Sequence, residues 1–289
     1  MGWSKGFVLG LALGLTATVS LATDNTQNRE QINELPVHIY NRYLIVAEGS
    51  IGNVHGLRLL VDTGTSTTAI DRRLAKRLGL PGQPAKLVNF DKIVPVEWGI
   101  IPEITLGPEQ VLRVPVFIED LSYLHAGPSP IDGIIGLDLL RRKTFMVDYE
   151  AGRVLFGATE TAGMHSVPMR VSQIAISVEA QLNGHAVWMI ADTGLLRTTL
   201  YERGVEAVLE NDRVQGHVVA QSLGGPVENR VSTVLQLRCG GQELDREVLF
   251  VAMPASHRLS DVAGFLGPAS FNPKLVVFDF DSNQLLWKN

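Results

Sequence analysis

The tripeptide Asp-Thr-Gly occurs twice in this 289-residue chain, at Asp62-Thr63-Gly64 and at Asp192-Thr193-Gly194. Each copy follows a run of apolar residues, so each Asp is expected at the end of a buried strand. Two carboxylates delivered by equivalent turns can lie face to face and share one proton. The ionised member of such a pair can deprotonate water, and the protonated member can donate to a substrate. Asp62 and Asp192 are therefore the candidate catalytic residues.

The other residues of the two tripeptides can support the carboxylates. Gly64 and Gly194 allow tight turns and let the two loops approach each other without a collision between Cβ atoms. Thr63 and Thr193 each carry a hydroxyl that can hydrogen-bond across the junction of the loops. We expect the two loops to hold each other rigidly through these residues.

The residue after each tripeptide differs between the copies. Thr65 has a hydroxyl that can donate to the outer oxygen of Asp62. Leu195 stands at the same place in the second copy, cannot donate through its side chain, and takes more space beside Asp192. The two candidate half-sites are therefore predicted to be unequal, with a higher pKa or a less well oriented carboxyl at Asp192.

The rest of the sequence repeats in the same register. The offset from Asp62 to Asp192 recurs, within one residue, from Gly133 to Gly264 and from Asp148 to Asp279. Self-similarity at one fixed period is strong evidence about architecture, and this period is too long for a solenoid. Two copies at this spacing indicate a duplicated domain.

The elements that must position the two Asp residues are mainly strands. Alternating apolar stretches at residues 43–46 and 174–178 are typical of strands. A short amphipathic helix is expected after the first Asp-Thr-Gly, because Ile70, Leu74 and Leu78 recur every four residues and Gly79 can end a helix. Its Arg and Lys residues are interpreted as a solvated face.

Two hairpins are expected at equivalent places in the two halves. In the second half, residues 218–220 enter, residues 222–226 turn, and residues 231–237 return, with Gly224 and Gly225 in the turn. The equivalent segment of the first half, residues 91–95, has no Gly-Gly pair, so the hairpin signal is weaker there.

These elements suggest an N-terminal lobe at residues 36–158 and a C-terminal lobe at residues 166–289. Small and polar residues replace the strand pattern between them. The formal net charge of −5 and the absence of a long basic run argue against binding to nucleic acid. The 7 His residues show no metal-ligand spacing, so neither a metal site nor a cofactor is expected. Cys239 is the single cysteine, which excludes an internal disulfide.

The first residues predict export. Lys5 precedes an uncharged run rich in Leu, Val, Ala and Gly, and Ser20-Leu21-Ala22 offers the small residues of a signal-peptidase site. Residues 1–22 are interpreted as a signal peptide of a periplasmic or secreted bacterial protein. An uncleaved N-terminal anchor remains the alternative, and contact with a membrane is expected only in that case.

Several segments together resemble the bacterial retropepsin-like aspartyl protease family: residues 60–67, 75–80 and 132–140, and in the second half residues 191–194 and 264–267. The resemblance covers roughly residues 36–289. It implies a mainly β, bilobal, pepsin-like pseudo-dimer of two retropepsin-like β-barrel halves with a few short helices, and a monomer with internal two-fold pseudosymmetry. In that superfamily a Gly-rich hairpin forms a flap over the substrate, so Gly224 and Gly225 are candidate flap residues.

The leading hypothesis is an aspartic endopeptidase that acts on peptides or proteins through Asp62 and Asp192. The alternative is a catalytically inactive protein that binds peptides or envelope proteins in the same cleft. Leu195 favours the alternative. Retention of Asp, Thr and Gly in both copies favours the enzyme, because a binding cleft has no need of two mutually repelling carboxylates.

Overall fold

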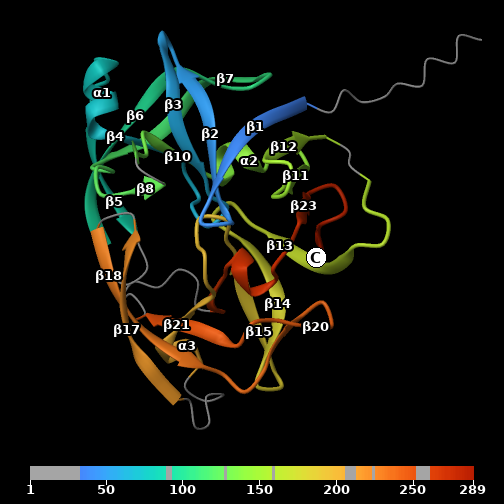
Figure 1. The fold of residues 1–289 in the computed structure, drawn as a ribbon. Helices are drawn as coiled ribbons and strands as arrows, with labels where there is room; N and C mark the ends of the chain where they lie inside the picture. The colour runs from blue at the N-terminus through green and yellow to red at the C-terminus, as the bar shows by residue number, and fades with distance from the viewer. Residues whose placement is uncertain are drawn as a thin grey trace, which may run out of the picture.

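A computed structural model describes residues 33–88, 93–126, 129–157, 160–205, 213–222, 225–251 and 261–289. The predicted signal peptide, residues 1–22, lies outside the described residues. Within those ranges, no helix is long and apolar enough to span a membrane. The chain forms two lobes that are rich in strands, one made by the first half of the chain and one by the second (Figure 1).

Six strands of the first lobe close into a barrel. The β3 strand pairs with β2 on one side and runs parallel to β10 on the other. The ring continues through β4 and β7 to β6, which pairs back onto β2. The barrel strands are β2 (Leu44–Ile51), β3 (Val54–Val61), β4 (Ala69–Asp71), β6 (Ile93–Leu106), β7 (Glu109–Glu119) and β10 (Gly133–Ile135); β5 (Gln83–Val88) pairs with β6, and β8 (His125–Ala126) pairs with β9 (Ser129–Pro130).

The second lobe repeats this ring with two of its strands interrupted. The pair β18 and β19 takes the place of β6, and the pair β21 and β20 takes the place of β7. The strands are β14 (Ile176–Leu182), β15 (His185–Ala191), β16 (Thr199–Tyr201), β17 (Arg213–Ser222), β18 (Gly225–Thr233), β19 (Leu237–Cys239), β20 (Gln242–Glu243), β21 (Glu247–Val251) and β22 (Val262–Leu266).

A shared sheet joins the lobes. Among the described residues its strand order is β1 (Asn33–Tyr40), β12 (Arg153–Phe156), β11 (Phe145–Asp148), β23 (Leu275–Asp279), β24 (Gln284–Lys288) and β13 (His165–Val171). The two central strands are equivalents in the repeat, and they pair with each other antiparallel, with the rings of Phe145 and Phe278 stacked at 4.8 Å. The predicted mainly β, two-lobed pseudo-dimer is therefore confirmed.

One apolar core runs through both lobes and the shared sheet. It includes Leu59 of the first lobe, Met189 of the second lobe, and Phe145 and Phe278 between them. Burial of these side chains provides most of the driving force that keeps the lobes together. The two Asp-Thr-Gly turns are thus attached to one packed body.

The predicted helix is present but starts later than its apolar spacing suggests. Ile70 lies in β4, and α1 (Arg72–Arg77) begins after Asp71, whose carboxylate accepts a hydrogen bond from the Arg73 N–H at 2.7 Å. This cap fixes the start of the helix. Gly79, with φ +62°, follows the end of the helix. The other short helical segments are α2 (Leu137–Leu140), α3 (Glu202–Val205) and the 3-10 turn η2 (Pro268–Ser270).

Both halves contain the expected hairpin. The β17 and β18 strands pair up to Ser222 and Gly225, so Gly225 lies in a strand rather than in the turn, which shortens the predicted turn. Gly224 lies outside the described residues. In the first half β5 and β6 pair from Gln83 and Trp98 to Val88 and Ile93, so this hairpin forms without a Gly-Gly pair.

Candidate active site

The two candidate catalytic residues end equivalent strands and are held by equivalent bonds. Asp62 follows β3, and its N–H donates to the Ile135 carbonyl at 3.0 Å. Asp192 follows β15, and its N–H donates to the Leu266 carbonyl at 3.1 Å. Each acceptor lies on the strand that runs parallel to the Asp-bearing strand, so the parallel pairing sets the position of both turns.

Thr63 and Thr193 interlock the two turns at the junction of the lobes. The N–H of Thr63 donates to Thr193 Oγ1 at 3.1 Å, and the N–H of Thr193 donates to Thr63 Oγ1 at 3.0 Å. Each hydroxyl in turn donates to a carbonyl of the opposite strand, Thr63 to Ala191 at 2.8 Å and Thr193 to Val61 at 2.9 Å. These four buried bonds fix the separation of the two turns.

Each glycine of the two tripeptides lies directly against the opposite carboxyl group. A Cβ atom added to Gly64 would overlap the carboxyl group of Asp192, and one added to Gly194 would overlap that of Asp62. Such overlaps exclude any larger side chain without movement of the carboxyl groups. The glycines are therefore required for the close approach of the two acids.

Asp62 has the richer set of hydrogen-bond donors. Its Oδ1 accepts from the N–H groups of Gly64 at 2.8 Å and Thr65 at 3.1 Å, and its Oδ2 accepts from the Thr65 hydroxyl at 2.9 Å. Burial raises the pKa of Asp62, whereas the Thr65 hydroxyl, the contact with Asp192 and the two N–H groups oppose that rise. These donors stabilise the ionised form.

Asp192 has a poorer set of donors and is only 6% exposed. Its Oδ1 accepts from the Gly194 N–H at 2.8 Å, and the Leu195 N–H also favours its charged form. Burial first, and then the negative charge of Asp62, raise the pKa of Asp192 well above its ordinary value. The richer donor set of Asp62 therefore favours the negative charge on Asp62 and the proton on Asp192.

The side chain of Leu195 has apolar neighbours in the second lobe. Its side chain packs against an apolar cluster in the second lobe, and its backbone N–H still faces Asp192. What the second half-site lacks relative to the first is one hydroxyl donor. The cluster consists of Ala175, Ile190, Tyr201, Val227, Val251, Val262 and Phe265.

A further set of hydrogen bonds supports the loop that carries Thr65. The spacing of the Asp-Thr-Gly repeats does not predict these hydrogen bonds. The Leu137 N–H donates to the Thr65 carbonyl at 2.8 Å. Asp138 Oδ1 accepts from the N–H and the hydroxyl of Thr68 at 3.0 and 2.8 Å. The second lobe replaces this carboxylate by a hydroxyl pair, Thr198 and Ser270, at 2.6 Å. The only signal of this contact in the sequence is Asp138 itself, two residues after the Ile134-Ile135-Gly136 segment.

The other acidic and thiol groups that the sequence analysis named have structural roles outside this site. Asp148 and Asp279 are the last residues of β11 and β23, and their carboxylates accept from the N–H groups of Ala151 at 2.8 Å and Ser282 at 3.1 Å in the turns that follow. Burial raises the pKa of the Cys239 thiol to about 12, so the sulfur is a protonated core group. Within the described ranges, no group of three or more His, Cys, Asp or Glu side chains is arranged to hold a metal ion.

The β17–β18 hairpin, which contains Gly225, belongs to the lobe of Asp192. On β18 the side chains of Val227 and Asn229 are buried, and Val227 belongs to the apolar cluster against which Leu195 packs. The hairpin and the residue after the second tripeptide therefore share one apolar contact surface. Its role as a flap stays a prediction.

The raised pKa of Asp192 predicts how stability depends on pH. The folded protein holds this proton more tightly than the unfolded chain, so the stabilising contribution is fully present below the unfolded pKa of about 3.9 and is lost as pH rises through the folded pKa. An Asn at this position bears no charge. The variant Asp192→Asn should therefore become more stable than the wild type as pH rises towards neutrality, with little difference near pH 3. Thermal unfolding of both proteins across this range measures the trend, and a constant difference in Tm would contradict it.

Comparison with protein families gives two matches within the chain. The model of the family described as aspartyl protease matches residues 47–139 and again residues 178–268. Each matched region contains one Asp-Thr-Gly turn and its parallel strand pair. No curated protein matches the chain significantly.

Proposed function

This chain belongs to the aspartyl protease family, and we propose from that premise that it is an endopeptidase whose catalytic pair is Asp62 and Asp192. The observation that carries the proposal is the junction of the lobes, where the partly buried carboxyl group of Asp62 and the buried carboxyl group of Asp192 approach each other with unequal hydrogen-bond donors. Such a pair carries one proton and one negative charge, which is the state that acid–base hydrolysis of an amide requires.

In the proposed reaction Asp62 is the base and Asp192 is the acid. Asp62 takes a proton from a water molecule, whose oxygen then attacks the carbonyl carbon of the peptide bond. Asp192 donates its proton to the carbonyl oxygen, which gives a tetrahedral diol. Asp62 then transfers its proton to the amide nitrogen while Asp192 takes a proton from one hydroxyl of the diol. The C–N bond breaks, the carboxyl and amine products form, and the starting protonation state of the pair is restored.

Cleavage of a mixed peptide library by the purified protein, measured from acid to neutral pH, tests this proposal. We expect internal cleavage within a bell-shaped pH range, and inhibition by a statine-type mimic of the tetrahedral intermediate. The rival function is a cleft that binds peptides without cutting them, which the missing hydroxyl at Leu195 favours. Binding of the mimic or of peptides with no cleavage at any pH would establish the rival.

Replacing Leu195 with threonine or with valine offers a second test. The two replacements have nearly the same shape, but only threonine has a hydroxyl group. In Leu195→Thr the new hydroxyl should donate to Asp192, as Thr65 does to Asp62, and lower the pKa of Asp192. The alkaline limb of kcat/KM should therefore move to lower pH in Leu195→Thr and stay in place in Leu195→Val. Both variants should lose some stability, since each removes apolar contact with the neighbouring cluster. Equal pH profiles would show that the residue does not tune the acid.

A further inference from the structure

A third carboxyl group of the first lobe, that of Asp138, is bonded to the loop that follows the first Asp-Thr-Gly turn. Asp138 lies in α2 and belongs to neither tripeptide. Its Oδ1 accepts from the Thr68 N–H at 3.0 Å and from the Thr68 hydroxyl at 2.8 Å. Thr68 is fully buried, so one carboxylate oxygen satisfies two donors that water does not reach. Asp138 therefore fixes the far end of residues 65–68.

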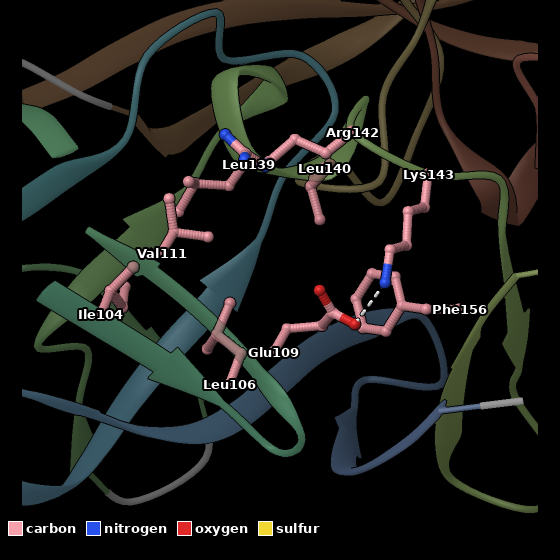
Figure 2. Close-up of a pocket in the computed structure, with 9 residues that line it drawn as sticks. All are labelled: Ile104, Leu106, Glu109, Val111, Leu139, Leu140, Arg142, Lys143 and Phe156. Atoms are coloured by element: carbon pink, nitrogen blue, oxygen red, sulfur yellow. Dashed lines mark hydrogen bonds and ion pairs between the residues drawn. The ribbon is translucent and has the colours of Figure 1, made fainter. Parts of the chain in front are cut away.

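The helical turn that carries Asp138 is itself held in place. Leu139 and Leu140 are buried, and they line a small pocket together with residues of the β6–β7 hairpin (Figure 2). Just after the turn, the Lys143 ammonium pairs with the Glu109 carboxylate of β7 at 2.7 Å. The carboxylate of Asp138 is thus attached to a packed part of the first barrel.

Other contacts join the same turn to the loop. The Thr68 hydroxyl accepts from the Gly136 N–H at 3.2 Å, and the Asp138 N–H donates to the Ser66 carbonyl at 3.2 Å. A Cβ atom at Gly136 would lie 2.9 Å from the Thr65 carbonyl oxygen, so the turn and the loop are in direct contact. A change at Asp138 is therefore expected to reach Thr65 through a short, packed segment.

Thr65 is the residue of this loop that contacts the catalytic pair. It gives Asp62 two donors, the N–H at 3.1 Å and the hydroxyl at 2.9 Å. Both bonds favour the ionised form of Asp62 and oppose the rise in its pKa that burial causes. Hydrogen bonds weaken steeply when they are misaligned, so this effect depends on where the loop holds Thr65.

The second lobe has an alanine at the equivalent place. Ala269 corresponds to Asp138, because each N–H donates to the carbonyl four residues after the catalytic Asp of its lobe, at 3.1 and 3.2 Å. The Thr198 hydroxyl meets Ser270 Oγ at 2.6 Å instead of a carboxylate oxygen. One bond between two hydroxyl groups thus replaces the two bonds that Asp138 accepts.

We propose that Asp138 is a positioning residue that makes Asp62, rather than Asp192, the ionised member of the catalytic pair. The inference rests on the proposed function of that pair. The two acids compete for one proton, so the better held set of donors decides which of them carries the charge. Asp138 acts through residues 65–68, which it holds where both donors of Thr65 reach Asp62.

The pKa of the Asp62 carboxyl group tests the proposal without a substrate. It is measured by 13C NMR of the full-length protein labelled at the Asp carboxyl carbons, with the signal assigned by its loss in Asp62→Asn. Asp138→Ala copies the residue of the second lobe and should raise the pKa of Asp62, because Thr65 is no longer held. Asp138→Asn keeps an acceptor oxygen and should keep the wild-type pKa. Thr198→Val, the matched change in the second lobe, should also keep it.

The pH profile of peptide hydrolysis gives a second readout. Asp62 must be ionised to act as the base, so a higher pKa moves the acid limb of kcat/KM to higher pH. On that limb Asp138→Ala should be about tenfold slower than the wild type, and the difference should shrink towards the optimum. Asp138→Asn should restore the wild-type position of the limb, which a purely structural loss of stability would not predict.

An unchanged pKa of Asp62 in folded Asp138→Ala would overturn the proposal, and so would equal shifts in Asp138→Ala and Asp138→Asn. Thr68→Val removes one of the two bonds and should shift the pKa in the same direction by less, which provides the test if Asp138→Ala does not fold. Because the NMR titration needs no turnover, a wild type that cleaves no peptide would refute the endopeptidase and leave the pKa of Asp62 to decide the role of Asp138.

Discussion

Replacing either Asp62 or Asp192 with asparagine is expected to abolish peptide hydrolysis while leaving both lobes folded. The loss should be about 10³-fold or more in kcat, because asparagine can neither take a proton from water nor donate one as a carboxylic acid does. The two residues act as one unit, so the double variant should be no slower than either single variant. Initial rates on one cleaved peptide, measured with matched protein concentrations, check this result.

The variant Asp138→Asn is the matched control, because it also replaces a carboxylate with an amide but at a position outside the catalytic pair. Its carboxylate is partly buried in the first lobe and accepts from the N–H and hydroxyl of Thr68, a role that the amide oxygen of asparagine can retain. The variant Asp138→Asn should therefore keep most of its activity. Retained hydrolysis in Asp62→Asn, or an equal loss in Asp138→Asn, would show that the reacting carboxyl groups have been wrongly assigned.

The second large effect is expected at the glycines between the lobes. In Gly194→Ala the new methyl group overlaps the carboxyl group of Asp62, and in Gly64→Ala it overlaps that of Asp192. Because the Thr63 and Thr193 bonds fix the loops, the carboxyl groups must move instead. A displacement of about 1 Å at reacting groups costs about 10²-fold in rate, so each variant should lose at least that much kcat.

Gly184→Ala separates this effect from a general loss of stability. Gly184 has φ +83° and open space around its Cα, so alanine there strains the backbone of the β14–β15 turn at the far end of the strand that leads to Asp192. We expect a lower Tm with nearly unchanged kcat. If Gly194→Ala lowered only Tm and not kcat, the close approach of the carboxyl groups would not matter for catalysis.

Much of the fold could be predicted because the duplication leaves a repeated pattern in the sequence. The register that joins Gly133 to Gly264 and Asp148 to Asp279 predicts two equivalent lobes, and both are present. The helix boundary was wrong by a few residues, because a capping carboxylate rather than apolar spacing decides where α1 begins. The first hairpin forms without the glycines on which its sequence signal depends, because β6 is held on both sides by β5 and β7.

Contacts between side chains that are distant in the sequence could not be predicted in the same way. The repeat marks Phe145 and Val276 as equivalents, but it does not say that the strands carrying them pair with each other. The bulk of Leu195 suggested a crowded carboxyl group, whereas the side chain turns into an apolar cluster formed by several strands. The direction of a side chain depends on how it packs against residues from other strands. The identity of a single residue does not carry that information.

Because both lobes belong to one chain, equivalent positions in the two lobes can be substituted independently. A homodimer on a two-fold axis carries every substitution on both sides of that axis. Here the two equivalent positions are encoded separately, so Thr65 can correspond to Leu195 and Phe156 can correspond to Trp287. Symmetry is kept where the two turns interlock and is broken beside them. Positions beside the turns can therefore differ between the two halves, whereas the residues that interlock the turns are the same in both.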